Sequence, residues 1–213
     1  MIFFGVVAFI SLPISAVLLM RSEKLLAKTE AVLQENKKLK GSLSQGQAAL
    51  LEQAKKVVPA TGLKHVVSPF DEQAIEAALR IREQYAGTRM TVITLGNEAS
   101  RNALKHGLAM GADDGLLLSD PAFEAGDAYT TARILSAALL KLGTVDLVLC
   151  GRQAADGDAG IVGAGIAELL DRPVLAFAMS VVVENNVVRV ERVVDDGTEI
   201  VETDLPALVT VSN

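Results

Sequence analysis

The sequence predicts an α/β fold in which helices cover both faces of a parallel sheet, with a β-hairpin near the C-terminal end. Short apolar runs, such as residues 89–95 and 145–150, alternate with amphipathic helical stretches. Strands that are buried on both faces have continuous apolar sequences of this kind. The hairpin is predicted by residues 187–194 and 199–211, which alternate apolar and polar side chains around an Asp-Asp-Gly turn.

The expected helices and strands follow from the spacing of apolar residues. The first helix places Ile75, Ala78 and Leu79 on one face. Glycine marks the ends of two later helices, at Gly111 and Gly143. In chain order we expect a helix over 71–84, a strand over 89–95, a helix over 98–111, a strand over 115–118, a helix over 127–143, a strand over 145–150, a helix over 160–172 and a strand over 173–184.

The first twenty residues contain no charged side chain. An apolar stretch of this length can cross a bilayer as a helix, and Pro13 is tolerated there. A cleaved secretory signal is the alternative, but no Lys or Arg precedes the apolar run as a signal requires. Arg21, Lys24 and Lys28 follow, so the positive-inside rule places the rest of the chain on the cytoplasmic side. We therefore expect a transmembrane helix over residues 1–20 that anchors the protein to the membrane.

Residues 21–60 are expected to form a polar helix and a linker between the membrane and a globular domain. Leu25, Val32 and Leu39 recur every seven residues, which is the period of a coiled coil. Polar residues interrupt this pattern, so a solvated stalk helix is the simpler alternative. The globular domain is expected to comprise residues 61–213.

Composition and charge exclude several classes of protein. Residues 67–213 carry 11 Lys or Arg and 22 Asp or Glu, and this acidic balance argues against a nucleic-acid partner. Trp is absent and aromatic residues make up 4% of the chain, so stacking platforms for single-stranded nucleic acid are not expected. The single cysteine, Cys150, excludes an internal disulfide framework and fits a reducing compartment.

The stretch GRQAADGDAG follows the apolar run at 145–150 and leads into a helix. Open α/β sheets bind ligands beyond the carboxyl ends of their strands, which is where this loop is expected. Its glycines allow the backbone to approach a ligand closely, and the next helix offers unpaired N–H groups to an anion. The stretch is neither a Walker A loop nor a G-x-G-x-x-G fingerprint. Both a phosphate-binding loop and an ordinary loop with glycine turns are consistent with these residues.

Residues 68–72, SPFDE, are a second candidate site at the start of a helix. Ser68 as N-cap, Pro69 as the first helical residue and Asp71 at the third position form a capping arrangement. Capping alone explains these residues. The alternative is that the same helix start forms part of a nucleotide pocket.

No catalytic group and no metal site are expected, so the protein is not expected to be an enzyme. His65 and His106 have no Ser or Cys nucleophile and no cluster of ligands at a recognisable spacing. Cys150 is expected to be a small core residue. Asp156 and Asp158 are expected to bond backbone N–H groups of their own turn.

Four stretches follow one another in a characteristic order: SPFDEQAIEAALRIRE, GLAMGADDGLLLSD, VDLVLCGRQAADGDAG and VERVVDDGTEIVETDLPALVT. Together, over residues 68–213, they resemble the beta subunit of electron transfer flavoprotein. The first is similar to the family's Asn-Pro-Phe-Asp-Glu helix start and the second to its Ala-Met-Gly-Ala-Asp turn. The third resembles its nucleotide loop and the fourth its hairpin.

This resemblance implies a Rossmann-like parallel sheet of the adenine-nucleotide-binding type in an electron carrier. Such a subunit holds AMP, or a second FAD in electron-bifurcating members, and pairs as a heterodimer with an alpha subunit that carries FAD. The pair passes electrons from acyl-CoA or other dehydrogenases to the respiratory chain or another acceptor. Carried over by position, the residues implied to contact the nucleotide are Ser68, Pro69, Phe70, Asp71, Leu95, Gly151, Arg152, Gln153, Ala154, Ala155, Asp156, Gly157, Asp158, Ala159, Gly160, Ile161 and Val162.

The chain also departs from the family pattern. The apolar and polar segments at the N-terminus replace the family's first strand with its Val-Lys-x-Val-Pro-Asp motif, and a sheet without that strand exposes an edge that must be covered. Ala159 and Ile161 stand where the family has Thr and Gln, and Ser68 stands where it has Asn. The changes at Ala159 and Ile161 remove side-chain hydrogen bonds to the ligand. The family's arm that recognises partner dehydrogenases does not follow the hairpin in these 213 residues.

Two alternatives to an electron-transfer subunit are open. One is a membrane-tethered nucleotide-binding or assembly module that has lost electron transfer. The other is an adenine-nucleotide hydrolase or ligase of similar fold, against which stands the lack of a Walker A or Ser-Gly-Gly-x-Asp-Ser loop.

Overall fold

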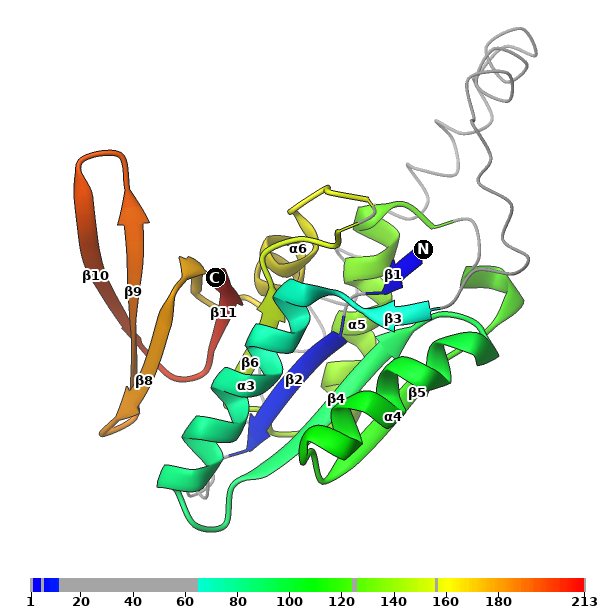
Figure 1. Cartoon of the computed structure of the whole chain (residues 1–213), viewed down its shortest axis with the longest axis horizontal. Coiled ribbons are helices and arrows are strands. Elements are labelled where there is room, and N and C mark those ends of the chain that lie inside the picture. The colour runs from blue at the N-terminus through cyan, green and yellow to red at the C-terminus, as the bar shows by residue number, and fades with distance from the viewer. Residues whose placement is uncertain (1, 5, 12–64, 124–125, 156, 213) are drawn as a thin grey trace, which may run out of the picture. The chain divides into compact units, whose positions relative to one another are not determined.

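The computed structural model describes residues 2–4, 6–11, 65–123, 126–155 and 157–212. Within these residues, the main sheet has six strands in the order β5-β4-β2-β6-β11-β7 (Figure 1). All of its strands run parallel except β2, which is antiparallel to both of its neighbours. The strands are β2 (Val6–Ser11), β4 (Arg89–Leu95), β5 (Asp114–Leu118), β6 (Leu147–Gly151), β7 (Val174–Ala178) and β11 (Ala207–Val211).

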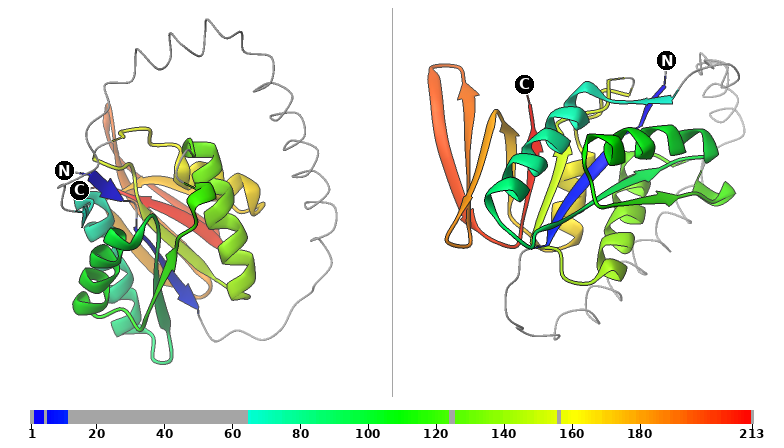
Figure 2. Two further views of the ribbon diagram at one scale, coloured as in Figure 1. Left: turned by 90° about the vertical axis from the view of Figure 1, so that its right-hand side faces the viewer. Right: turned by 60° about the horizontal axis from the view of Figure 1, so that its bottom comes forward.

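Helices cover both faces of this sheet, as the sequence predicts. Figure 2 shows α3 and α4 on one side of the sheet and α5 on the other. The buried side chains of α3 and α4 belong to one apolar cluster, and those of α5 and α6 belong to a second. The helices are α3 (Pro69–Gln84), α4 (Arg101–Met110), α5 (Ala128–Leu142) and α6 (Val162–Leu169).

Strand β6 shows why its sequence is apolar at every position. Leu147 and Leu149 are buried in the cluster beneath α3, whereas Val148 and Cys150 are buried in the cluster beneath α5 and α6. Successive side chains of a strand point to opposite faces, so a strand covered on both sides needs an unbroken apolar run. The predicted α/β fold is therefore confirmed, with one difference: the sheet is mixed, because β2 is antiparallel to its neighbours.

A separate antiparallel sheet contains β8 (Ser180–Glu184), β9 (Val187–Val194) and β10 (Gly197–Asp204). The predicted turn at Asp195-Asp196 joins β9 to β10, so this hairpin is confirmed. A second hairpin, β8–β9, turns at Asn185-Asn186, where both residues have positive φ, as a type I′ turn requires.

Two strand predictions near the C-terminus need correction. The run at 173–184 is not one strand, because β7 belongs to the main sheet and β8 to the antiparallel sheet. Residues 207–211, expected to continue the hairpin, instead form β11 between β6 and β7. The remaining described elements are short: β1 (Ile2–Phe4), which pairs with β3 (His65–Val67), and the 3-10 helices η1 (Glu98–Ser100) and η2 (Pro121–Phe123).

The N-terminal segment differs most from expectation. A transmembrane helix was the prediction for residues 1–20, but residues 2–4 form β1 and residues 6–11 form β2 in the middle of the main sheet. None of the helices in the described part of the chain is long and apolar enough to cross a bilayer. An uncharged apolar run serves equally well for a central strand of a sheet covered on both faces, and residues 6–11 pair with β4 and β6 in this way. The predicted stalk at 21–60 lies outside the described residues.

Candidate functional site

Three segments meet at the edge of the main sheet where its parallel strands end. β6 ends at Gly151 and continues into the loop of residues 152–161, and β4 ends at Leu95. Because β4 and β6 run parallel on either side of β2, their carboxyl ends lie at the same edge. The third segment is the start of α3 at Pro69, which hydrogen bonds join to the loop. Open α/β sheets bind their ligands at this edge.

Side chains at the start of α3 connect the helix to the loop. Asp71 Oδ1 accepts a hydrogen bond from the backbone N–H of Gly151 at 2.8 Å. Ser68 Oγ donates to the carbonyl oxygen of Gln153 at 3.5 Å. Ser68 occupies the N-cap position as predicted, yet its side chain makes no capping hydrogen bond. Since Ser68 and Asp71 are both buried, these bonds fix the loop against the helix.

Two glycines of this region allow close packing. A Cβ atom on Gly151 would lie 2.7 Å from the Cβ of Phe70 and 2.8 Å from the backbone nitrogen of Asp71. A Cβ atom on Gly163, in the first turn of α6, would lie 2.7 Å from Thr210 Cγ2. No side chain fits at either position without displacing a neighbour. The glycines therefore bring the loop against α3, and α6 against the sheet.

Arg152 stands at the centre of the site. Its guanidinium lies over the ring of Phe70, 4.7 Å from the ring centroid. Its backbone N–H donates to the carbonyl oxygen of Val211 at 2.9 Å, which fixes the position of the residue at the sheet edge. Its Nε is buried and has no hydrogen-bond acceptor among the described residues. A buried guanidinium N–H without an acceptor is costly and is suited to an anionic ligand.

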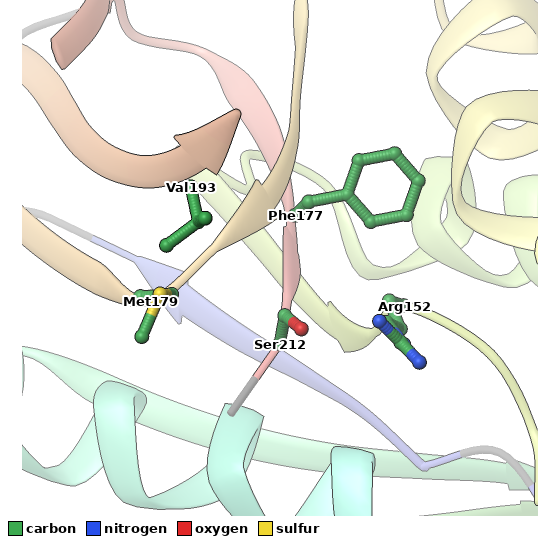
Figure 3. Close-up of a pocket in the computed structure, with 5 residues that line it drawn as sticks. All are labelled: Arg152, Phe177, Met179, Val193 and Ser212. Atoms are coloured by element: carbon green, nitrogen blue, oxygen red, sulfur yellow. The ribbon is translucent and has the colours of Figure 1, made fainter. Parts of the chain in front are cut away.

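A cavity of about 390 Å³ opens beside Arg152. Figure 3 shows the ring of Phe177 extending to the side on which Arg152 lies, while Met179 and Val193 lie across the cavity. Phe177 has a φ of +63°, a strained value for an aromatic residue, and its N–H donates to Thr210 Oγ1 at 3.0 Å. Sequence reasoning missed Phe177, Met179, Val193 and Ser212, which line this cavity with Arg152.

The rest of the loop is more open. Gln153 Nε2 donates to Asp158 Oδ1, and the N–H of Asp158 donates to the carbonyl oxygen of Ala154 at 3.0 Å. The Asp158 carboxylate therefore bonds the Gln153 side chain, whereas a bond to backbone N–H was expected. Ala155, Gly157, Ala159, Gly160 and Ile161 are exposed, and Asp156 lies outside the described residues.

The loop leads into the N-terminus of α6. Ile161 occupies the N-cap position and provides no side-chain cap. The first N–H groups of a helix have no partner within the helix, and the helix dipole adds a partial positive charge there. Apart from Asp156, the predicted site residues from Gly151 to Val162 thus form one loop. It is bonded to the start of α3 at Gly151 and Gln153 and runs into the start of α6 at Val162.

Cys150 is a core residue, as predicted. It is buried behind the loop, and its thiol lies 3.9 Å from the carbonyl oxygen of Val209. Burial, and secondarily the negative charge of Asp71, raise the pKa of the Cys150 thiol. The thiol is therefore neutral and is not a nucleophile at pH 7.

We expect Cys150 of the native protein to be inert to the thiol reagent DTNB at pH 7 and to react once the protein is unfolded in urea. Because the folded-state pKa is raised, the stability contributed by the neutral thiol is present at pH 7. It is lost as the pH rises above about 8.5, the ordinary thiol value. Stoichiometric reaction of the native protein at pH 7, followed by absorbance, would contradict this burial.

Each of the two histidines contacts a polar residue of another element. His65 is buried, with its Nδ1 3.3 Å from Ser100 Oγ, and His106 pairs on the surface with Glu72 at 3.1 Å. Among the described residues, no three His, Cys, Asp or Glu side chains gather to hold a metal ion. The site offers an anion the Arg152 guanidinium and the N-terminus of α6.

Comparison with known proteins identifies the family. The sequence model described as "Electron transfer flavoprotein domain" matches residues 55–213, about three quarters of the chain. The chain belongs to the electron transfer flavoprotein family. This confirms the resemblance noted in its four motifs, and the match includes all of the predicted site residues.

Relatives within the electron transfer flavoprotein family point to its beta subunits. The chain is 45% identical over 149 residues to "Electron transfer flavoprotein subunit beta" of Thermoanaerobacterium thermosaccharolyticum, covering 70% of this chain and 56% of that protein. It is 42% identical to "Caffeyl-CoA reductase-Etf complex subunit CarD" of Acetobacterium woodii, covering 70% and 57%. It is 38% identical to "Protein FixA" of Azotobacter vinelandii, covering 70% and 55%. The chain thus spans about half the length of these relatives.

Proposed function

We propose that this chain is an electron-transfer subunit that binds an adenine nucleotide at the edge of its main sheet and pairs with an alpha subunit that carries FAD. One observation carries the proposal: the hydrogen bond between Asp71 and Gly151 joins the start of α3 to the glycine loop. This contact lies at the edge of the sheet where the parallel strands end. Membership of the electron transfer flavoprotein family supports the same function.

The residues present suit the part that AMP and FAD share, an adenosine phosphate. The uncapped first turn of α6 and the Arg152 guanidinium offer N–H groups to the phosphate. Phe70 and Leu95 offer apolar contacts for the adenine. Since Ala159 and Ile161 have no polar side-chain atoms, backbone groups would make most of the polar contacts of this part of the loop. AMP and FAD are both candidates for the pocket.

The alpha subunit's FAD would supply the electron-carrying ring, so this chain needs no acid, base or nucleophile. Its role is to hold the nucleotide and to dock the partner. Phe177, Met179 and Val193 support a partner surface, because each side chain is more than half exposed and they lie together around one cavity. The relative named as a subunit of a caffeyl-CoA reductase-Etf complex favours an acyl-CoA oxidoreductase as electron donor or acceptor.

We do not propose a membrane anchor over residues 1–20, because residues 6–11 pair on both sides within the main sheet. The predicted placement of the chain on the cytoplasmic side stays a prediction; the single cysteine fits a reducing compartment.

Co-expression with an alpha subunit tests the proposed function. We expect a stable heterodimer that contains FAD and, in addition, one AMP or a second FAD, identified by mass spectrometry after denaturation. We also expect the bound FAD to be reduced by an acyl-CoA dehydrogenase with its substrate. A nucleotide-loaded heterodimer that accepts no electrons would favour the module that has lost electron transfer. Failure to bind both alpha subunit and nucleotide would contradict the proposal.

Replacing Arg152 with Gln is expected to weaken AMP binding about 10- to 100-fold, because a hydrogen bond to a charged group contributes about 1.5–3 kcal/mol. Equilibrium dialysis at two salt concentrations measures this, and the variant should lose much of the salt dependence. Arg80→Gln is the matched control, since Arg80 is an exposed cation on α3 that pairs with Glu76. Equal affinities of the two variants would exclude Arg152 from the site.

A further inference from the structure

The last part of β7 contains a β-bulge. The pairing of β7 with β11 is regular up to Leu175 and resumes at Ala178, with a shift in register between the two. Within this interval β7 has two residues, Ala176 and Phe177, where β11 has one, Thr210. An extra residue of this kind bends a strand and turns a side chain in a new direction, and such bulges are frequent beside functional sites.

The bulge turns Phe177 out of the core. In a regular strand Leu175 and Phe177 would face the same side of the sheet, because successive side chains alternate. Instead, Leu175 and Ala178 both belong to the apolar cluster that α3 and α4 cover, and Phe177 is 52% exposed. A small alanine thus occupies the buried position, while the larger aromatic side chain is exposed.

The backbone of Phe177 lies in the left-handed region, at a φ of +63°. The other non-glycine residues with positive φ in the described part of the chain are of types that tolerate this region: Asp158, Asp171, Asn185 and Asn186. A half-exposed ring makes few contacts within the chain that could offset the strain. Strained residues of this kind persist where the surrounding structure enforces them, and they cluster at functional sites.

Hydrogen bonds on both sides of the bulge enforce its conformation. The N–H of Phe177 donates to Thr210 Oγ1 at 3.0 Å. The N–H of Met179 donates to the carbonyl oxygen of Glu191 at 2.8 Å. These bonds attach the bulge to β11 and to β9, so the direction of the ring is fixed before any partner binds.

We propose that Phe177 is the residue that anchors the alpha subunit, and that the bulge holds its ring in the position for this contact. The proposal rests on the proposed function, since it names the residue that carries the pairing proposed there. A few residues supply most of the affinity of an interface, and they are commonly aromatic. An aromatic ring held in one direction loses little conformational entropy when a partner binds it.

The surroundings of the ring define the surface that the alpha subunit presents. Met179 and Val193 are 51% and 62% exposed and lie across the cavity from Phe177 (Figure 3), so the centre of the contact is apolar. Arg152 adds a positive charge to the cavity, although Asp and Glu outnumber Lys and Arg by 22 to 11 over residues 67–213. The complementary surface of the alpha subunit is therefore an apolar pocket with a carboxylate at its rim.

Two substitutions in the full chain separate the strain from the ring. Phe177→Ala and Phe177→Gly both remove the ring, but the glycine alone adopts a positive φ without strain. We therefore expect Phe177→Gly to have a Tm about 2–4 °C above that of Phe177→Ala, as measured by circular dichroism. Equal Tm values would show that position 177 is not strained, and they would overturn the proposal.

Isothermal titration calorimetry of the full chain with the FAD-loaded alpha subunit measures docking. We expect both Phe177 variants to bind the alpha subunit at least tenfold more weakly than the wild type, which is the size of effect that an anchor residue has. Leu140→Ala is the matched control, because Leu140 is a 60% exposed apolar residue on α5 and is not among the residues that line the cavity. We expect this control to bind as the wild type does.

A glycine variant that melts above the alanine variant and still docks at least tenfold more weakly than the wild type supports the proposal. Docking of either Phe177 variant at wild-type affinity, or an equal loss in Leu140→Ala, overturns it and leaves the proposed function standing. If the wild-type chain binds AMP in dialysis but does not bind the alpha subunit, the proposed pairing fails, and the anchor fails with it.

Discussion

Replacing Gly151 with Ala is expected to abolish AMP binding and to lower the free energy of unfolding by about 1–3 kcal/mol, the usual cost of an overpacked site. The added Cβ would lie 2.7 Å from Phe70 Cβ and 2.8 Å from the backbone nitrogen of Asp71. Both contacts are shorter than those that real Cβ atoms make. Neither neighbour can turn away, because the Phe70 Cβ is attached directly to the α3 backbone and the Asp71 nitrogen is part of it. The loop must therefore move away from α3, which breaks the Gly151–Asp71 hydrogen bond.

Urea unfolding and equilibrium dialysis with AMP measure the two effects of Gly151→Ala. Gly157→Ala is the matched control in the same loop, since a Cβ there would meet nothing within 4 Å. We expect this control to match the wild-type protein in stability. If Gly151→Ala also matches the wild type in both measurements, the close approach of the loop to α3 has no role in the site.

Replacing Asp71 with Ala is expected to be the next most damaging change. The carboxylate is buried and accepts the Gly151 N–H, so its removal leaves that donor without its acceptor and costs about 1–3 kcal/mol. The loop would lose its attachment to α3, and we expect AMP affinity to fall at least tenfold. Thermal unfolding should show a lower Tm, by about 2–4 °C for each kcal/mol in a domain of this size.

Asp71→Asn separates the acceptor from the charge. The amide oxygen can accept the Gly151 N–H at the same place, so we expect this variant to keep most of the stability and of the AMP affinity that Asp71→Ala loses. Equal loss in both variants would show that the charge, and not the hydrogen bond to Gly151, holds the loop.

The start of α3 illustrates what could be predicted about the site. The sequence places a helix start at Pro69 and a glycine loop after β6, and the structure confirms both. It could not show that Asp71 bonds Gly151, because the two residues are 80 positions apart and no local pattern records the contact. A capping motif involves residues close in the sequence, so the sequence predicts capping for Ser68. In the structure the Ser68 side chain makes no capping bond and contacts the loop.

The N-terminus shows where sequence reasoning misjudged the fold. A run of apolar residues without charge is typical of a membrane helix and also of a strand buried on both faces, and hydropathy does not separate the two. What distinguishes a strand from a membrane helix here is that residues 6–11 lie between β4 and β6 in the main sheet. Only the topology of the sheet shows this position. Phe177 and Met179 could not be predicted as cavity residues for a similar reason. The chain passes from the main sheet to the antiparallel sheet between β7 and β8, but the apolar run in the sequence continues without a break across this point.

Photoaffinity labelling of the full chain with 8-azido-AMP tests the central claim most directly. We predict that the label attaches to peptides containing residues 68–71, Leu95 or residues 151–162, and that excess AMP prevents the labelling. Labelling elsewhere in the chain, or labelling that AMP does not prevent, would contradict a nucleotide site at this edge of the sheet.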